Sequence, residues 1–147
     1  IIIPVLFLVS ALLSCTGTIE PDFSAIADPH ARWEAYRLTD YTIEQRRNCF
    51  CINGGVFMQV VVRDNLIRDI VDISRGTSLP AAEWQWYKTV DQLFVIIAGI
   101  NPDSVASFHA WYDPLYGYPT SFFVDPSAGI ADEEYGYDSK NLTRLNR

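Results

Sequence analysis

Apolar and polar residues alternate with a period of two in the segment that begins at Tyr41 and ends at Cys51. Tyr41 and Ile43 share one face of this segment with Cys49 and Cys51. The other face is polar and carries Thr42, Glu44, Arg46 and Asn48. A period of two is typical of a β-strand, and one polar face indicates an antiparallel strand that is half exposed to solvent.

Further strands follow at short intervals. Asn53-Gly54-Gly55 predicts a hairpin turn, because primed turns need residues that adopt positive φ. Residues 56–63 and 66–73 then form two strands around a tight turn at Asp64-Asn65, which completes a three-stranded meander. Alternation returns at residues 105–112 and 118–124, on either side of a turn that Asp113-Pro114 opens. Residues 132–145 offer one more edge strand, which makes five or six strands in all.

Two segments have the signature of helices. Asp28-Pro29 is a good helix start and precedes helix formers over residues 31–38. Thr89 and Gln92 form a capping box before apolar residues at helical spacing, among them Phe94 and Ile97, which we expect to be buried. Residues 74–88 between the strands and this helix read as an irregular loop. The pattern as a whole predicts an α+β fold, a five- or six-stranded antiparallel sheet with two helices packed on one face and the other face partly open.

The beginning of the chain indicates where the protein resides. Residues 1–13 are apolar and uncharged, yet shorter than the roughly 20 residues that span a bilayer. They end in Leu12-Leu13-Ser14-Cys15, which resembles a bacterial lipoprotein cleavage site with Cys15 as the lipidated residue. The alternative is a buried N-terminal strand in which Cys15 is an ordinary thiol.

These features predict three parts. Residues 1–14 are a truncated lipoprotein signal peptide, since neither Met nor a basic residue precedes the apolar run; residues 15–27 are a flexible tether; and residues 28–147 are a single α+β domain. We expect the protein in the bacterial cell envelope, anchored in a membrane and facing the periplasm or the exterior.

The charge pattern narrows the classes of partner. The net charge is -7 and there is no basic cluster, which argues against nucleic acid and anionic lipid surfaces. The expected partners are the membrane, through the lipid anchor, and an envelope protein.

Catalytic signatures are few, and no cofactor is expected. The chain lacks the nucleophile elbow, zinc-protease, phosphate-loop and dinucleotide motifs. Any histidine-dependent mechanism would rest on His109, which strand parity places on the same face as Asp113, although a solvent-facing histidine is the simpler interpretation. The carboxylates that could supply oxygen ligands to calcium are Asp125, Asp132, Glu133 and Glu134, but their spacing does not fit an EF-hand loop, and a solvated acidic turn is the simpler interpretation.

Cys49 and Cys51 allow three interpretations. In an extended strand, residues i and i+2 lie about 6.5 Å apart, beyond the roughly 5.5 to 6 Å that disulfides prefer. A disulfide or redox pair therefore requires a local bend or bulge. Buried free thiols and a soft-metal site are the two alternatives.

Exposed aromatic residues suggest a binding surface. Arg46, His109 and Trp111 project from predicted strands toward the polar face, and Trp111 is the best single anchor because interfaces favour Trp, Tyr and Arg. Tyr116 and Tyr118 add aromatic groups from a turn. The alternative is that such aromatic residues seal the ends of a small core.

Several of these motifs occur together in a known bacterial family. The block Y-D-P-L-Y-G-Y-P-T at residues 112–120 is the most specific, and Cys49-Phe50-Cys51 is next. Trp33, the segment T-V-D-Q-L-F at residues 89–94, Asp125 and the run D-E-E at residues 132–134 complete the set. Over residues 33–142 the chain resembles domain of unknown function 6174, although Asn65 stands where such sequences usually have Gly. The resemblance implies a cell-envelope location, often through a lipid anchor, and no known activity.

The function expected from the sequence is non-catalytic binding or a structural role at the envelope surface. The alternative is a metal-binding or hydrolytic envelope enzyme that uses His109 and the acidic residues. An enzyme needs these groups to converge in a pocket, whereas a binding domain presents them across a flat sheet.

Overall fold

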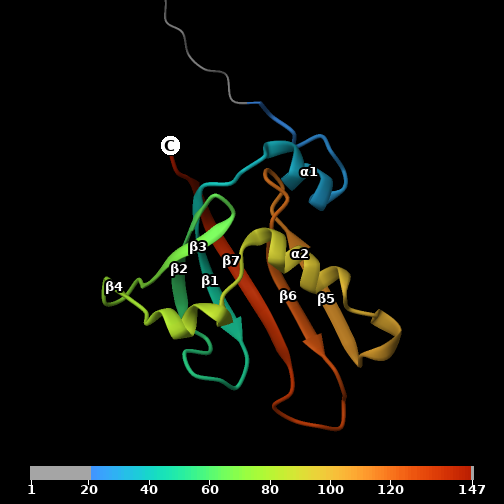
Figure 1. The fold of residues 1–147 in the computed structure, drawn as a ribbon. Helices are drawn as coiled ribbons and strands as arrows, with labels where there is room; N and C mark the ends of the chain where they lie inside the picture. The colour runs from blue at the N-terminus through green and yellow to red at the C-terminus, as the bar shows by residue number, and fades with distance from the viewer. Residues whose placement is uncertain (1–20, 147) are drawn as a thin grey trace, which may run out of the picture.

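The structure is a computed structural model and describes residues 21–146, which fold into one seven-stranded antiparallel sheet (Figure 1). The strands are β1 (Tyr41–Asn48), β2 (Phe57–Arg63), β3 (Leu66–Asp72), β4 (Thr77–Ser78), β5 (Ser107–Tyr112), β6 (Pro119–Asp125) and β7 (Tyr135–Arg144). The helices are α1 (Pro29–Tyr36), the 3-10 helix η1 (Ala81–Trp86), α2 (Val90–Ala98) and the 3-10 helix η2 (Pro102–Ser104). The order across the sheet is β4-β3-β2-β1-β7-β6-β5.

This architecture corrects the predicted fold class. The protein is mostly β, with seven strands where five or six were predicted. The helices are too short to form the layer that an α+β fold requires, because α1 has 8 residues and α2 has 9. In Figure 1, α1 lies at one end of the sheet and α2 crosses β6.

The largest error concerns β7. We predicted an edge strand in this segment, but β7 has 10 residues and lies in the middle of the sheet, between β1 and β6. Its side chains are mainly polar because they pair with polar side chains of β1, as in Glu44 opposite Lys140 and Arg46 opposite Asp138. A central strand of this composition lacks the apolar run by which such strands are usually recognised.

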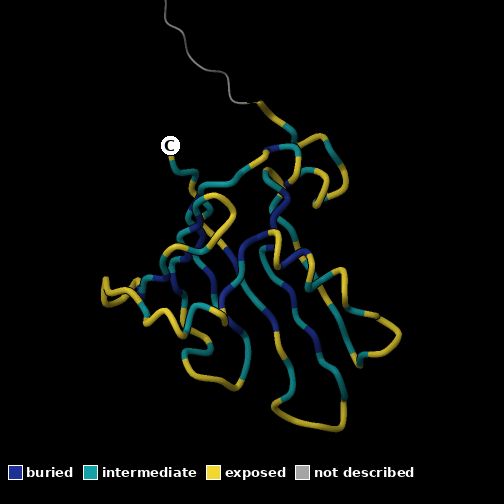
Figure 2. Tube along the Cα trace, in the orientation of Figure 1, coloured by how far each residue is buried: buried dark blue, intermediate teal, exposed yellow. Residues whose placement is uncertain are grey.

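The buried residues of neighbouring strands share one face of the sheet, where they pack against residues of the short helices. Figure 2 shows where the buried positions lie along the strands. The alternating faces predicted for β1 are confirmed, since Tyr41 and Ile43 are buried while Thr42 and Glu44 are half-buried on the other face. Phe94 of α2 is buried, as predicted. Ile97 is only half-buried and packs against the part of the core around Phe122 and Val124.

Side chains at the helix starts explain why the two α-helices form where they do. Asp28 caps α1, since its carboxylate accepts a hydrogen bond of 2.7 Å from the Ala31 N–H. Thr89 and Gln92 form the predicted capping box of α2. Both caps satisfy backbone N–H groups that otherwise lack partners in the first turn.

The predicted signal peptide, tether start and lipidated Cys15 lie outside the described residues. Within residues 21–146, no helix has the length and apolar character needed to cross a membrane.

Candidate functional site

The side of the sheet opposite the core is a broad face that we call the open face. Alternate residues of β2, β1, β7, β6 and β5 lie on this face, because residues that pair directly across neighbouring strands point to the same side of the sheet. Its central residues are Glu44, Arg46, Phe57, His109, Trp111, Ser121, Phe123, Asp138 and Lys140. In Figure 1, no helix of residues 21–146 covers this face.

The centre of the open face is a cluster of paired charges. Arg46 binds Asp138 through both Nε, at 3.0 Å, and Nη2, at 2.5 Å, and the Ser121 hydroxyl donates to the same carboxylate at 2.6 Å. Burial raises the pKa of Asp138, but hydrogen bonds from Ser121, Arg46 and Asn48 outweigh it, so the pKa lies below its ordinary value. Asp138 therefore remains an anion and fixes the orientation of the Arg46 guanidinium.

Phe57 lies beside this cluster between two cations. The Arg46 guanidinium carbon is 4.7 Å from the centre of the Phe57 ring, and the Lys140 ammonium is 4.0 Å from it. Lys140 also pairs with Glu44 at 3.6 Å. These contacts hold long side chains flat against the sheet and keep the surface shallow.

His109 and Trp111 form the aromatic end of the open face. Both lie on β5, their rings stack with centroids 5.7 Å apart, and 55% of Trp111 is exposed to solvent. This placement agrees with the predicted orientation of both residues. Residues 74–88, predicted as an irregular loop, contribute η1, and Tyr87 directly after η1 packs in the core on the other side of the sheet.

The two turn tyrosines lie elsewhere. Tyr118 is 5% exposed and belongs to the core, where burial raises its pKa to about 12. Tyr116 packs against Tyr36 of α1, with ring centroids 4.9 Å apart. Both tyrosines seal the end of the core where α1 packs, which is the alternative that the sequence left open. Of the predicted binding-surface residues, the open face therefore contains Arg46, His109 and Trp111 but neither tyrosine.

The acidic residues considered for catalysis or metal binding divide between two turns and one shallow depression. Asp113 accepts hydrogen bonds from the N–H groups of Leu115 and Tyr116 and so stabilises its own turn. Asp125 does the same for the N–H of Ser127. Asp132 and Glu134 line a shallow depression together with Cys49 and Phe50. Glu133, which lies between them in the sequence, is half-buried. Among the described residues, no three His, Cys, Asp or Glu side chains gather in a way that could hold a metal ion.

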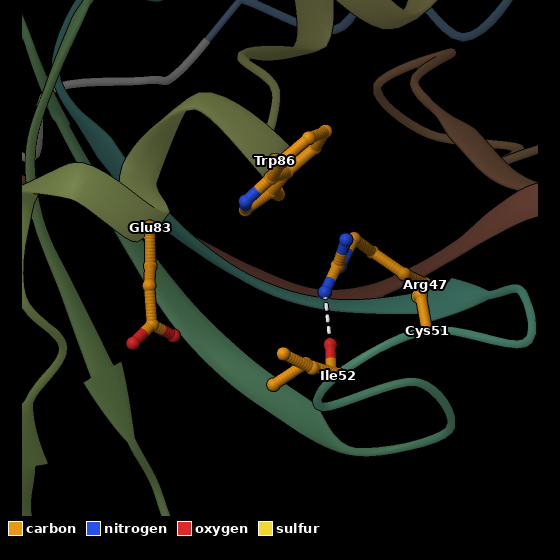
Figure 3. A pocket seen from close by; sticks show the side chains of 5 residues that line it. All are labelled: Arg47, Cys51, Ile52, Glu83 and Trp86. Atoms are coloured by element: carbon orange, nitrogen blue, oxygen red, sulfur yellow. Dashed lines mark hydrogen bonds between the residues drawn. The ribbon is translucent and has the colours of Figure 1, made fainter.

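A second candidate site is a pocket of about 340 Å³ at the end of β1 (Figure 3). Five residues from β1, the following loop and η1 line it: Arg47, Cys51, Ile52, Glu83 and Trp86. Figure 3 shows Trp86 and Ile52 on opposite walls, with the Arg47 guanidinium between them. The pocket thus combines an aromatic wall, an aliphatic wall and a positive charge.

Arg47 is unusual because its charge lies on the core side of the sheet. It is 8% exposed and donates a hydrogen bond to the carbonyl of Ile52, and its guanidinium carbon lies 5.4 Å from the Tyr87 ring centre and 5.8 Å from that of Trp86. Its Nε has no hydrogen-bond partner among the described residues. The charge affects its surroundings: burial lowers the pKa of Lys88, and repulsion by Arg47 lowers it further.

The loop of residues 49–56 closes the pocket and contains a disulfide between Cys49 and Cys51. The strand ends at Asn48, and the chain bends so that the Cys51 N–H donates to the Cys49 carbonyl and the two Cα atoms are 5.4 Å apart. This bend supplies the departure from extended geometry that such a bridge needs. Gly54 lies inside the bend, where an added Cβ would overlap the carbonyl oxygen of Cys49.

Sequence reasoning did not identify this pocket. The alternation itself offered a signal, since Arg47 falls on the same parity as Tyr41 and Ile43, and an arginine at a buried position needs partners. Trp86 and Glu83 lie in a segment that we predicted as an irregular loop. No local pattern showed that this segment would form η1 and fold against the loop that follows β1.

Comparison with known proteins gave one match. The model of DUF6174, a family of unknown function, matches residues 25–144. Neither the curated proteins nor the solved structures gave a significant match.

Proposed function

The chain therefore belongs to the DUF6174 family, and from this premise we propose that it is a protein-binding lipoprotein of the bacterial cell envelope. The observation that carries the binding role is the open face with Trp111 at its end. More than half of this side chain is in solvent, and ring stacking on His109 fixes its orientation. A large apolar side chain that is exposed and held in place is typical of the anchor residues of protein interfaces.

The shape of the open face favours a protein over a small molecule as the partner. Arg46 and Lys140 lie flat over Phe57, and their charges are balanced by Asp138 and Glu44. A partner that meets this surface finds oriented donors and acceptors without having to order them, which reduces the entropic cost of binding. Asp113 and Asp125 accept hydrogen bonds within their own turns, and among the described residues no three His, Cys, Asp or Glu side chains could hold a metal ion, so the enzymatic alternative has little support on this face.

Photocrosslinking tests the binding role. A photoreactive residue is placed at Trp111 in one variant and at Val95 in another, since Val95 is 73% exposed on α2 and lies away from the open face. We expect a discrete protein adduct in the producing cells from position 111 only, and Trp111→Ala should weaken capture of that same protein. Equal adducts from both positions, or none from position 111, would contradict the proposal.

The lipid anchor is proposed from the run Leu12-Leu13-Ser14-Cys15. Acyl chains contribute about 0.8 kcal/mol for each buried methylene, and two or more chains hold a protein stably on a membrane. Replacement of Cys15 by Ser should move the protein from the membrane fraction to the soluble fraction. A variant that remains in the membrane fraction like the parent would refute the anchor.

A further inference from the structure

We propose that the Cys49–Cys51 disulfide exchanges with cysteine thiols of extended polypeptides, and that the Arg47 pocket receives the polypeptide beside it. This inference goes beyond the proposed binding role and concerns a different part of the molecule. It rests on the exposure of Cys51, on the apolar side chains around it and on the buried charge in the same pocket.

The disulfide is open to attack from one side. Cys51 is exposed and lines the pocket, whereas Cys49 is half-buried. An attacking thiolate must reach a disulfide sulfur through solvent, so access favours the sulfur of Cys51. A bridge between residues i and i+2 also closes a very small loop and therefore restricts the unfolded chain less than a bridge that closes a longer loop. The disulfide therefore adds little to the stability of the fold, and stability alone does not explain why it is present.

The surroundings of Cys51 fit a polypeptide substrate. Phe50 is 88% exposed and Ile52 is 82% exposed, so the residues on both sides of Cys51 present apolar side chains to solvent. Trp86 adds a half-exposed aromatic wall to the pocket next to them. Such apolar groups at the tip of a loop are costly unless they contact a partner, and side chains near a cysteine in an unfolded polypeptide provide apolar contacts.

Arg47 supplies the electrostatic part of the site. Its buried guanidinium lines the same pocket as Cys51 and donates a hydrogen bond to the carbonyl of Ile52, the residue that follows Cys51. A nearby cation stabilises a thiolate relative to a thiol and makes it a better leaving group. Arg47 is therefore a positioning residue, which acts on Cys51 without itself reacting.

The reaction balances as follows. A substrate thiolate attacks Sγ of Cys51, a bond forms between the two sulfurs, and the Cys49–Cys51 bond breaks with its electron pair leaving on Cys49, which takes up a proton. A second thiolate of the same polypeptide then attacks the substrate sulfur of this mixed disulfide and expels Cys51 as a thiolate. The polypeptide is oxidised to a disulfide and the protein is reduced to a dithiol. A small disulfide such as oxidised glutathione restores the protein for the next turnover.

Redox equilibrium gives the first test. The full chain with Cys15→Ser, which removes the third cysteine, is incubated in millimolar mixtures of reduced and oxidised glutathione and then alkylated. We expect Cys49 and Cys51 to change from oxidised to reduced as the mixture becomes more reducing, while the circular dichroism spectrum stays the same. A pair that stays oxidised in all mixtures, or that is reduced only as the protein unfolds, would show that the disulfide is structural.

Single-cysteine variants locate the attacked sulfur. In the Cys15→Ser background, Cys49→Ser leaves Cys51 alone and Cys51→Ser leaves Cys49 alone. Oxidised glutathione should form a mixed disulfide at least tenfold faster with Cys51 than with Cys49. The pKa of Cys51, followed by thiolate absorbance, should lie below the ordinary thiol value of about 8.5 and should rise toward it when Arg47 is replaced by Met. Equal rates for the two cysteines, or a Cys51 pKa at the ordinary value in the folded Cys49→Ser variant, would overturn the proposal.

The substrate class is tested with a reduced peptide that carries two cysteines among apolar residues, and with a matched peptide in which the apolar residues are replaced by Ser. Trp86→Ala should slow oxidation of the apolar peptide about tenfold more than it slows oxidation of the Ser peptide, because only the apolar peptide contacts the aromatic wall. Val95→Ala on α2 is the control and should leave both rates unchanged. Oxidation of the two peptides at equal rates would show that the pocket does not receive the polypeptide.

Discussion

Replacement of Phe94 by Ala tests whether α2, although it is short, is an essential part of the core. Phe94 is 6% exposed, its ring centroid lies 4.4 Å from that of His30, and it stacks on Tyr112 at 6.0 Å. Truncation of a buried Phe costs about 3 to 5 kcal/mol. A surface depression bounded by His30 and Tyr112 reaches the Phe94 side chain, so water can fill part of the space, and we expect the lower end, about 3 kcal/mol.

Urea denaturation followed by tryptophan fluorescence measures this loss. A small domain loses about 1 to 3 kcal/mol of unfolding free energy for each molar of urea, so the midpoint should fall by about 1 to 3 M. Val95→Ala is the matched control, because Val95 is on the same helix and 73% exposed, and its midpoint should change little. A loss below about 1 kcal/mol for Phe94→Ala would show that α2 does not stabilise the sheet.

Three further predictions concern the sheet and the helix cap. The pKa of Asp138 is lowered in the folded protein, so its carboxylate stabilises the fold at any pH above the unfolded carboxyl pKa of about 3.9. This contribution is lost as the pH falls through the lower folded value. Asp138→Asn should therefore reduce stability at pH 7 and weaken the acid dependence of melting curves below pH 4. Gly136→Ala should destabilise the sheet strongly in thermal melts, because an added Cβ would overlap the Phe122 carbonyl, whereas Gly129→Ala meets open space and should have little effect. Thr89→Ala removes the cap of α2 and should cost about 1 kcal/mol in urea denaturation.

The sequence predicted the strands whose side chains alternate cleanly. In β2, the buried residues Met58, Val60 and Val62 alternate with half-buried neighbours, so local pattern and burial agree. In β7 the local pattern and the burial disagree, because the buried residue Ser139 is polar and its neighbours Asp138 and Lys140 are charged. The interactions that stabilise β7 include pairing with β1, which lies far away in the sequence, and the hydrophobic pattern within β7 itself does not reveal them.

The candidate sites divide in the same way. His109 and Trp111 were predicted correctly as neighbours on the open face, since strand parity alone determines their orientation. The Arg47 pocket needed knowledge of how the loop after β1 and helix η1 come together. That meeting depends on long-range contacts such as the hydrogen bond from the Asn53 amide to Glu83.

The central place of β7 has a consequence for biosynthesis. Strands β1 to β4 form one continuous group and β5 with β6 forms another, and β7 alone joins the two by pairing with both β1 and β6. An exported chain emerges from its N-terminal end, so β7 is the last of these strands to become available, and until then both groups have an unpaired strand edge beside the gap that β7 will fill. Unpaired edges are the surfaces through which nascent chains associate wrongly. Emergence of β7 should therefore coincide with completion of the sheet, and a chain truncated before residue 135 should depend on a chaperone to remain soluble.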